Sequence, residues 1–569
     1  MTTTRRDTHA LSLAAMPTPA VCAFADNADT TSNSHTPRNL VPAAKVSFAN
    51  VHDLAHAELP WNAKAMASRH APSRATTSPA ASKGICMQGA IRAAGFSLMT
   101  MFVSCGVGAT DLDTRIGKIA MEGELPTREA IPRLYAELDF QQATQSYLWA
   151  LPLVSYAQWQ EEFRDKLGAK SGDLMVLNTY EDKLGVITAN ATTPYILGFV
   201  DLNETGPLVI ELPPGPTAGG VGDFWQRAII DMGQTGPDKG KGGKYLVLPP
   251  GAELPADAGK YYLAKSETMN VLVGFRVLDP DPAKGKALVE QFKMYPYAKR
   301  AEPGKTRLLS PGGKAWSGTQ PRGMAYWERL HQIIQKEPVN ERDRFYMAML
   351  ASLGIEKDKP FNPNDHQRKA LEQGAQVGEL IAKANTFAKR FPDAQFWRDR
   401  QWDTVLNIAE PSQRVAYYDQ LWERSAWFYE AVTNTKGMVS KTPGLGQTYL
   451  GAYTDSTGNW LDGAKSYRLH VSANPPAKQF WSMTVYDIDT RCLIDNPQRK
   501  ADLSSRQDLK KNADGSVDLY FGPTAPQGFE NNWVQTVPGK HWFSYFRLYA
   551  PTEAYFDKSW KLDDITAVE

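Results

Sequence analysis

The stretch Tyr486-Asp-Ile-Asp-Thr-Arg491 holds the side chains best suited to acid–base chemistry, with Asp495-Asn496 shortly after it. If the strand that begins at Phe480 continues through it, alternation places Asp487, Asp489 and Arg491 on one face. Two close carboxylates raise the pKa of one of them, whereas a neighbouring guanidinium lowers both pKa values. Such a group can exchange protons with a substrate or bind a divalent cation. The alternative is a strand end whose Asp and Asn side chains bond the local backbone.

Two other stretches near the C-terminus place polar side chains on one face of an expected strand. In residues 467–471, alternation puts Arg468 and His470 together. In residues 541–549, the side chains that share a face are His541, Phe543, Tyr545, Arg547 and Tyr549. A histidine here can act as a general base, Arg547 can bind an anion, and the tyrosines can donate protons or stack on a ligand. The alternative is a solvated sheet face or a contact between domains.

A third group lies in the first half of the chain, where a tryptophan accompanies amides and hydroxyls. Its members are Asn190, Thr192, Thr193, Tyr195, Asp223, Trp225 and Gln226. This mixture suits a carbohydrate or another polar, partly apolar ligand. The alternative is that Trp225 fills the core and Asn190 serves a turn.

Several sharper signatures are missing from residues 110–569. The histidines there are His331, His366, His470 and His541, and no His-x-x-x-His pair or cysteine cluster occurs, which argues against a zinc site. No Gly-x-Ser-x-Gly motif occurs. The glycine- and lysine-rich stretch 236–244 lacks the spacing of a phosphate-binding loop. We therefore predict no cofactor, apart from a divalent cation as an open alternative at Asp487 and Asp489.

The elements that must position these residues alternate between helix and strand. Apolar spacing predicts a helix over 127–168, short strands from 173 to about 278, and strands again from 449 to the end. Between them, the helical segments are expected near 284–296, 324–336, 340–353, 364–390 and 411–433. The predicted organisation is a helical segment (110–170), a first β domain (171–280), a helical region (281–440) and a C-terminal β domain (441–569). The fold class is mainly β with a helical insert (α+β).

Two stretches resemble known families. The first contains Asn178-Thr-Tyr-Glu-Asp-Lys183, Asn190-Ala-Thr-Thr-Pro-Tyr195, Gly206-Pro-Leu-Val-Ile-Glu211 and Gly222-Asp-Phe-Trp-Gln226. It resembles the domain of unknown function 1254. The second contains Phe480-Trp-Ser-Met-Thr-Val-Tyr-Asp487, Asp495-Asn-Pro497, Asn512-Ala-Asp-Gly515 and Phe546-Arg-Leu-Tyr549. It resembles the domain of unknown function 1214. The resemblance implies an exported bacterial protein with two β-sandwich or jelly-roll-like domains, and it carries no catalytic residues to transfer.

The first 109 residues have a different character from the rest. Residues 1–86 are rich in Ala, Ser, Thr, Pro and Asn. This composition predicts a disordered leader, or else translation begins at Met87 and residues 1–86 are an incorrectly assigned extension. Met87-Gln-Gly-Ala-Ile-Arg92, an uncharged run from Ala93 to Val107 and the small residues 107–109 together predict a signal peptide over 87–109. The uncharged run is too short to span a membrane. Lipidation at Cys105 is an alternative, and Cys492 alone remains in the mature chain.

These patterns favour an exported periplasmic or secreted protein. With 63 basic and 62 acidic residues, the chain has no electrostatic footprint for nucleic acid. We expect an enzyme, a hydrolase or lyase acting on a polar or carbohydrate-like substrate through carboxylate, His and Tyr side chains. The alternative is a non-catalytic ligand-binding or envelope structural protein, and assembly into a homo-oligomer is also open. We expect any cleft to lie between the two β domains or against the helices.

Overall fold

The computed structural model describes residues 111–568. The predicted leader (1–86), the predicted signal peptide (87–109) and Cys105 therefore lie outside the described residues. No helix among residues 111–568 combines the length and the apolar character needed to cross a membrane.

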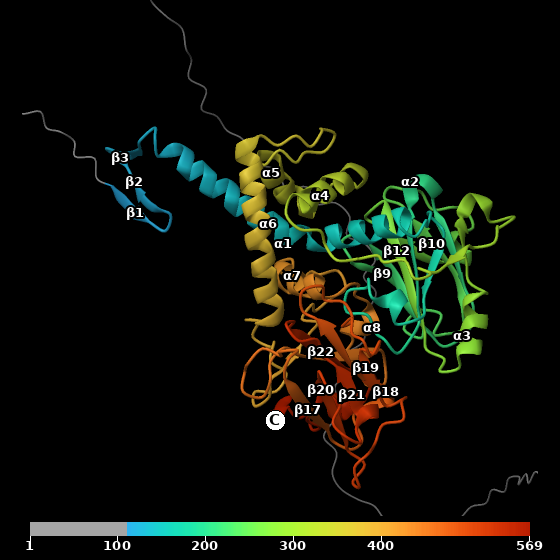
Figure 1. The fold of residues 1–569 in the computed structure, drawn as a ribbon. Helices are drawn as coiled ribbons and strands as arrows, with labels where there is room; N and C mark the ends of the chain where they lie inside the picture. Colours follow the sequence, from blue (N-terminus) through green and yellow to red (C-terminus); the bar gives the residue numbers. More distant parts are fainter. Residues whose placement is uncertain (1–110, 569) are drawn as a thin grey trace, which may run out of the picture. The chain divides into compact units, whose positions relative to one another are not determined.

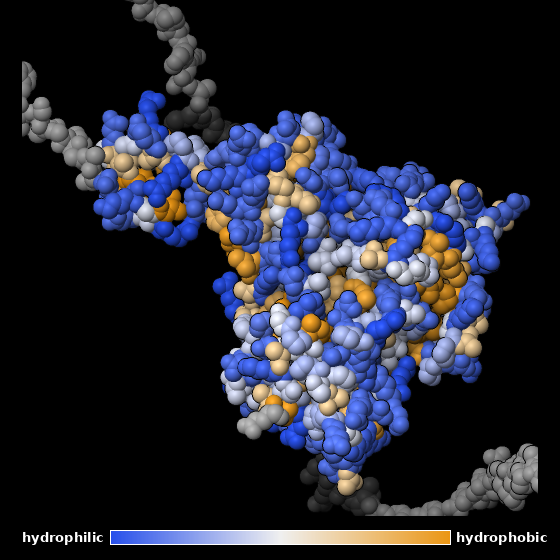
Figure 2. All heavy atoms as spheres, viewed as in Figure 1, coloured by the Kyte–Doolittle hydropathy of each residue, from blue (hydrophilic) through white to orange (hydrophobic). Residues whose placement is uncertain are grey.

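A 35-residue helix, α1 (Ile131–Asp165), confirms the helix predicted over 127–168. Two small hairpins precede it, formed by β1 (Leu112–Thr114) with β2 (Gly117–Ile119) and by β3 (Met121–Glu122) with β4 (Leu125–Pro126). Figure 2 shows apolar side chains gathered at these hairpins, where Leu112 and Leu125 are exposed. Within α1, Pro152 cannot donate a backbone hydrogen bond, and the side chains of Gln226 and Arg424 bond the carbonyls of Pro152 and Trp149.

The first β domain consists of two sheets (Figure 1). The six-stranded sheet has the order β14-β5-β6-β12-β8-β9, and the four-stranded sheet has the order β11-β10-β7-β13. The strands are β5 (Leu174–Leu177), β6 (Tyr195–Asp201), β7 (Leu208–Leu212), β8 (Thr217–Asp223), β9 (Ala228–Gly233), β10 (Gly243–Leu248), β11 (Tyr262–Lys265), β12 (Asn270–Val277), β13 (Lys293–Pro296) and β14 (Leu308–Leu309). The two sheets share one core, in which Val273 of β12 and Ile210 of β7 are buried.

Helices connect the two β domains. They include α4 (Met324–Lys336), α5 (Arg344–Ser352), α6 (Asp365–Phe387), α7 (Leu421–Glu430) and α8 (Lys436–Val439), whereas α3 (Pro282–Val289) lies within the first β domain, between β12 and β13. Short turns of helix occur elsewhere, at η1 (Glu181–Lys183), α2 (Leu202–Thr205), η2 (Ala258–Lys260), η3 (Tyr297–Lys299), η4 (Glu341–Asp343), η5 (Glu530–Asn532) and α9 (Glu553–Phe556). The predicted helix over 284–296 is wrong beyond residue 289, because residues 293–296 form β13. The predicted helix over 411–433 begins only at Leu421, since residues 411–420 form turns.

The C-terminal β domain also pairs two sheets. The five-stranded sheet has the order β15-β16-β22-β18-β19, and the four-stranded sheet has the order β21-β20-β17-β23. The strands are β15 (Trp402–Thr404), β16 (Gln447–Ala452), β17 (Ser466–Val471), β18 (Ala477–Asp487), β19 (Asp502–Ser504), β20 (Val517–Gly522), β21 (Trp533–Gln535), β22 (Trp542–Pro551) and β23 (Thr566–Val568). Between the sheets, the ring of Trp542 lies 5.1 Å from that of Phe521. The chain is thus α+β, with two sheet-containing domains connected by helices, as predicted.

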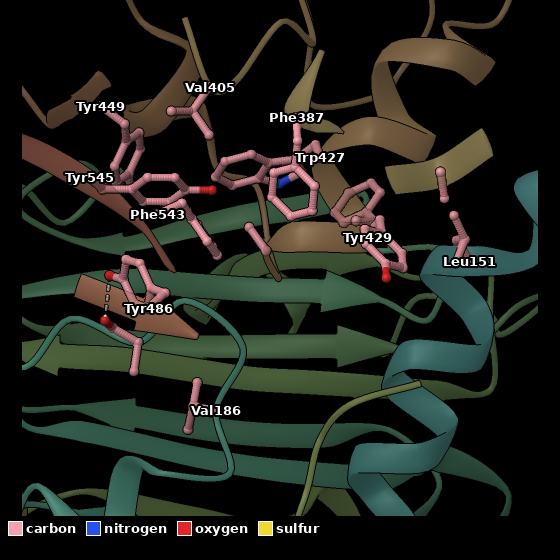
Figure 3. Packing of buried hydrophobic residues seen from close by; sticks show 14 of the residues in the cluster. Leu151, Val186, Phe387, Val405, Trp427, Tyr429, Tyr449, Tyr486, Phe543 and Tyr545 are labelled. Atoms are coloured by element: carbon pink, nitrogen blue, oxygen red, sulfur yellow. Dashed lines mark hydrogen bonds between the residues drawn. The ribbon is translucent and has the colours of Figure 1, made fainter. Parts of the chain in front are cut away.

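Each large sheet has a second face that is not part of its own sandwich core. On β6 and β12 this face carries Leu197 and Leu272, and on β22 it carries Phe543 and Tyr545. These residues share one large cluster with α1, α6 and α7. Figure 3 shows part of that cluster, with Tyr449, Tyr545 and Trp427 gathered on one side and Val186 on the other. The candidate site lies between these two faces.

Candidate functional site

A cavity lies between the six-stranded sheet of the first β domain and the five-stranded sheet of the second. It encloses about 1400 Å³ of empty space, including the open solvent at its mouth. Strands β6, β8 and β12 line one side, and β16 and β22 line the other. Residues 431–438 and 444–447, which lead into the second domain, supply a further wall. The cleft is therefore where the sequence analysis expects it, between the β domains and against the helical region.

The first wall is a regular grid of side chains, because β12 pairs with β6 on one edge and with β8 on the other. Arg276 of β12 lies between Tyr195 and Ala218. Two residues earlier, Gly274 lies between Leu197 and Gly220, and two residues before that, Leu272 lies opposite Gly222. Since alternate residues of a strand share a face, these rows all point the same way. Because the residues of β8 on this face are Ala218, Gly220 and Gly222, few side-chain atoms project into the cavity here.

The opposite wall carries the polar face that the sequence predicts for 541–549. Tyr545, Arg547 and Tyr549 alternate along β22 and line the cavity. The neighbouring strand β16 adds Tyr449 opposite Arg547 and Gln447 opposite Tyr549. The predicted sharing of one face is thus confirmed for these residues of β22.

Arg547 is a buried cation without a carboxylate partner. Its side chain donates one hydrogen bond to the carbonyl oxygen of Thr188 (3.0 Å), and its Nη1 has no partner. The guanidinium lies 5.1 Å from the ring centre of Tyr545 and 5.6 Å from those of Tyr449 and Tyr486. Aromatic faces attract a cation, but they do not neutralise it. Because an unpaired buried charge is costly, a partner from outside the chain would stabilise this arrangement.

Arg276 is the second cation on the cavity wall. Its Nη2 donates to Oε1 of Gln447 (2.6 Å), and its Nη1 lies 3.4 Å from the hydroxyl of Tyr549. The amide of Asn190 also contacts that hydroxyl. Each partner of the Arg276 guanidinium is neutral, so its positive charge remains uncompensated by the side chains that hold it in place.

The tyrosines around the two arginines stay protonated. Burial raises the pKa of Tyr449 and of Tyr486 well above the ordinary value. Burial raises the pKa of Tyr545 as well, and the negative charge of Glu430 raises it further. No phenolate is therefore available near neutral pH to neutralise Arg276 or Arg547.

Several buried polar atoms at the cavity have no hydrogen-bond partner. Both Oδ1 and Nδ2 of Asn434 are unpartnered, and the same holds for the hydroxyl of Tyr545 and for Nη1 of Arg547. All three residues line the cavity. Beside Arg547 and Tyr545 on the same sheet face, the hydroxyls of Ser482 and Thr484 on the neighbouring strand β18 are also buried and unpartnered. Buried polar groups are normally bonded, so this concentration indicates a place for a ligand or for ordered water.

The charge of the cavity wall is one-sided. Among the residues that line it, Arg276 and Arg547 are the only charged ones, and Asp, Glu, Lys and His are absent from that set. The nearby carboxylate of Asp502 accepts a hydrogen bond from Thr192 (3.0 Å), and the positive charges of Lys183, Lys500 and Arg547 act on it without an ion pair to Arg547. Burial lowers the pKa of Lys183 to about 8. The field inside the cavity therefore favours an anion.

The first predicted group, Asp487, Asp489 and Arg491, does not line the cavity. The prediction that they share a strand face is wrong, because β18 ends at Asp487 and the next residues form a turn. Asp487 Oδ1 accepts from the backbone N–H groups of Asp489 (3.0 Å) and Thr490 (2.8 Å). Asp489 pairs with Arg322, and Arg491 bonds the carbonyl oxygens of Tyr429 and Asp489. These side chains stabilise a turn and the adjacent packing.

A cation held by Asp487 and Asp489 finds little support in these contacts. The second oxygen of Asp487 lies 3.1 Å from Nζ of Lys540, and Asp489 faces Lys383 as well as Arg322. Across residues 111–568, no three His, Cys, Asp or Glu side chains are grouped so that they would hold a metal ion. The charges that a cation would need are already matched by basic side chains.

The predicted histidines also lie away from the cavity. Nδ1 of His470 lies 2.8 Å from Oδ1 of Asp518, on the sheet that contains β17 and β20. His541 is exposed and precedes the first residue of β22. Neither histidine has access to the cavity, so neither is placed to serve a ligand bound there.

The third predicted group is divided between the cavity and the core. Tyr195 and Gln226 line the cavity. Asn190 contacts Tyr549, and Thr192 bonds Asp502, so both support the site from behind. Trp225 is buried instead, with its ring 4.7 Å from that of Trp149. Trp225 is thus a core residue, which is the alternative that the sequence left open.

Sequence reasoning missed Arg276, Gln447, Tyr449 and Asn434. One signal for Arg276 exists, namely a single charged residue inside the otherwise apolar run Asn270-Val-Leu-Val-Gly-Phe-Arg-Val277. A lone charge in a strand buried on both faces is unusual and marks a candidate site. Asn434 has no such signal, because it lies in a connecting segment whose position depends on the packing of both domains.

Comparisons with known proteins agree with this division. Residues 173–296 match the family described as Protein of unknown function (DUF1254), and residues 446–553 match Protein of unknown function (DUF1214). The predicted resemblance is thus confirmed at both ends. No curated protein matches the chain.

Two solved structures are similar to this chain at low sequence identity. The VPA0106 protein from Vibrio parahaemolyticus is 16% identical, with a TM-score of 0.49 over 76% of this chain and 100% of that one. An uncharacterized protein from Burkholderia cenocepacia is 12% identical, with a TM-score of 0.35 over 77% of this chain and 97% of that one.

Proposed function

We propose that the protein binds a small organic anion in the cavity between its two β domains. The observation that carries this proposal is the pair Arg276 and Arg547, the only charged side chains lining the cavity, neither of which has a carboxylate partner within residues 111–568. An anion would compensate both charges and would supply acceptors to Nη1 of Arg547 and to the hydroxyl of Tyr545.

The rest of the lining indicates an apolar body for the ligand. Leucine, valine and aromatic side chains surround the bare glycine positions of β8 and β12. Cavities of this kind bury most of a small ligand and fix its orientation with a few polar groups. The amide of Asn434 and the hydroxyl of Tyr545 are such groups. A carbohydrate, which carries hydroxyls on every side, suits this lining less well than an anion with an apolar body.

Binding is better supported than the expected hydrolase or lyase chemistry. The carboxylates and histidines on which that chemistry would depend are engaged elsewhere: Asp487 in a turn, Asp489 with Arg322, and His470 with Asp518. No carboxylate or imidazole lines the cavity. The alternative named from the sequence, a non-catalytic ligand-binding protein, is therefore the function that the site supports best.

A fluorescent organic anion provides the test. Anilinonaphthalene sulfonate emits strongly when it enters an apolar site, and we expect saturable binding to the folded protein. Because hydrogen bonds to a charged group are each worth about 1.5–3 kcal/mol, Arg276→Met or Arg547→Met should weaken binding at least about tenfold. Arg344→Met is the matched control, since that side chain is 68% exposed and outside the cavity. Equal affinities for all variants would contradict the proposal.

An enzyme remains a second candidate because of Tyr545. Its hydroxyl lines the cavity and has no partner within hydrogen-bond distance, so it could donate a hydrogen bond to an oxygen that gains negative charge during a reaction. Turnover of an aryl ester of a short alkanoic acid, lost in Tyr545→Phe while anilinonaphthalene sulfonate still binds, would favour this candidate. Binding of the acid without turnover of the ester would favour the first.

The proposal includes export of the protein, which rests on the sequence of residues 87–109 alone. We expect cleavage after Ala109, so that the mature chain starts at Thr110. Sequencing the N-terminus of the protein recovered from the periplasm of a bacterial host tests this expectation. A chain that retains Met87 would contradict it, and a lipidated Cys105 would identify the alternative.

A further inference from the structure

The cavity changes character along β12, and this gradient bears on the kind of anion that fits. Arg276 marks one end, where its row also holds Tyr195 and where Gln447 and Tyr549 approach from the opposite wall. Leu272 marks the other end, four residues earlier on the same face. The charged end and the apolar end thus belong to one straight strand, so their separation follows from strand geometry.

A strand advances about 3.4 Å per residue, which places Leu272 roughly 14 Å from Arg276. An extended alkyl chain advances roughly 1.3 Å per carbon, so a body of about ten carbons matches this separation. Three aromatic rings linked end to end have a similar length. The distance between the two ends of the cavity fits both an alkyl and an aromatic body. A bare inorganic anion would be too small to fill the cavity.

The apolar end is built to receive such a body. Leu272 and Leu197 line it from the sheet, and Tyr156 and Trp159 of α1 close it. Opposite Leu272, Gly222 provides no side chain. A Cβ at Gly222 would meet only the carbonyl oxygen of Arg227 at 3.6 Å and the hydroxyl of Tyr156 at 3.9 Å. The missing side chain leaves space in front of Tyr156 that a ligand can occupy.

We propose that the ligand is an amphiphilic anion, with its head at Arg276 and Arg547 and an apolar body of about ten carbons directed towards Gly222 and Leu272. This inference rests on the proposed function and adds the class and the orientation of the ligand. Arg276 is bonded to neutral partners and Arg547 is surrounded by tyrosines, so no carboxylate of the cavity wall matches either positive charge. The shared chemistry covers aliphatic and aromatic acids.

A homologous series of straight-chain carboxylates measures the length of the site. Each buried methylene contributes about 0.8 kcal/mol, so affinity measured by calorimetry should rise about fourfold per carbon from butanoate to octanoate. We expect the gain to stop near decanoate, when the body reaches the closed end. A naphthalene carboxylate serves as the aromatic arm. Its affinity relative to octanoate distinguishes an aromatic ligand from an aliphatic one.

Substitutions at the apolar end and at the charged end of the cavity should change the affinities of the carboxylate series in different ways. Gly222→Leu places a side chain in the apolar end, where the Cβ has ordinary contacts, so the protein should fold normally. This variant should keep the affinity for butanoate and lose at least about tenfold for decanoate, which corresponds to two methylenes. Arg276→Met and Arg547→Met should instead weaken every member of the series by a similar factor. Gly259→Leu, at a glycine with open space around it, is the control for Gly222→Leu.

The outcomes separate this inference from the proposed function. Failure of both the carboxylates and anilinonaphthalene sulfonate to bind would overturn the proposed function and the inference with it. Binding of the anions with an affinity that does not depend on chain length would overturn the inference alone. A length dependence that Gly222→Leu leaves unchanged would show that the body lies elsewhere, and this too would overturn the orientation assigned here.

Discussion

At the scale of single residues, the state of Arg547 is the least usual feature of the molecule. Buried ion pairs often contribute little net stability, and a buried charge without a partner contributes less still. The rings of Tyr449, Tyr486 and Tyr545 and the hydrogen bond to the carbonyl oxygen of Thr188 compensate the positive charge of Arg547 only in part. A residue retained for stability alone would be expected to have a carboxylate nearby.

A stability measurement on Arg547→Met follows from this reasoning. Methionine keeps most of the buried volume and removes the unpaired charge, so the free energy of unfolding should stay within about 1 kcal/mol of wild type or rise. Chemical denaturation monitored by tryptophan fluorescence provides the value. A loss of more than about 3 kcal/mol would indicate that Arg547 is a structural residue.

The turn at Asp487 leads to the opposite expectation. Because Asp487 accepts hydrogen bonds from two backbone N–H groups, Asp487→Ala should lower the free energy of unfolding by about 1–2 kcal/mol. Asp487→Asn, which keeps an acceptor oxygen, should lose less. Binding of anilinonaphthalene sulfonate should be unchanged in both variants. A large loss of anilinonaphthalene sulfonate binding in Asp487→Asn would show that Asp487 contributes to the functional site.

Sequence reasoning succeeds at this scale where a strand continues and fails where it ends. The face of Tyr545, Arg547 and Tyr549 could be predicted because β22 runs without a break through all three. The face of Asp487 and Asp489 could not, because a backbone turn after Asp487 redirects the chain. Strand alternation is reliable only within the hydrogen-bonded ladder, and the sequence does not mark its last residue.

At the scale of elements, the contact between α1 and α6 positions the wall that Tyr156 and Trp159 contribute. The two helices cross closely (Figure 1), and Gly378 of α6 faces Tyr147 of α1. A Cβ at Gly378 would lie 2.7 Å from the ring of Tyr147, which is below any normal contact. Glycine is needed here because the helices approach so closely.

This close approach predicts the effect of a single methyl group. Gly378→Ala should lower the free energy of unfolding by about 1–2 kcal/mol, because overpacking outweighs the better helix propensity of alanine. Gly259→Ala, at a site with no atom within 4 Å of the added Cβ, should change it by less than about 0.5 kcal/mol. Thermal denaturation of both variants tests the comparison. Equal stabilities would contradict the close packing of α1 and α6.

The helices illustrate what periodicity can and cannot predict. The helix expected near 324–336 agrees with α4 residue for residue, because its apolar spacing is regular. Residues 293–296 are instead drawn into a sheet by pairing with β7, which lies more than 80 residues earlier. Local spacing contains no information about such a partner, so tertiary pairing overrides it.

At the scale of the whole molecule, buried carboxylates couple stability to pH. Glu430 lies behind Tyr545, where it bonds the hydroxyl of Tyr453 and lies 3.5 Å from Nζ of Lys389. Burial raises its pKa from 4.5 to about 7, and the charge of Lys389 opposes this shift. The folded state therefore favours the protonated form. The stability that Glu430 contributes is fully present below pH 4.5 and is lost as the pH rises through 7.

The variant Glu430→Gln isolates this effect, since glutamine cannot ionise. Relative to wild type, its free energy of unfolding should rise by on the order of 3 kcal/mol between pH 4 and pH 8, in line with the shift in pKa. Glu341→Gln, at a side chain that is 94% exposed, should follow the wild-type profile. Denaturant titrations at several pH values provide the comparison. Parallel profiles for wild type and Glu430→Gln would show that Glu430 does not titrate in this range.

The large-scale organisation of the molecule was more predictable than its site. Two β regions with helices between them follow from periodicity, the sandwich-like domains follow from the family resemblance, and the cleft between them follows from the usual location of ligand sites. The charge pattern of the cleft does not, because Arg276 and Arg547 lie 271 positions apart and meet only when two sheets face each other. No local pattern connects them.

A crystal structure of the protein soaked with a decanoate that carries bromine on its last carbon tests the central claim most directly. The account predicts the carboxylate within hydrogen-bond distance of Arg276 and Arg547, and the bromine signal beside Gly222 and Leu272. A fully occupied bromine site elsewhere, with the cavity between the β domains empty, would contradict it.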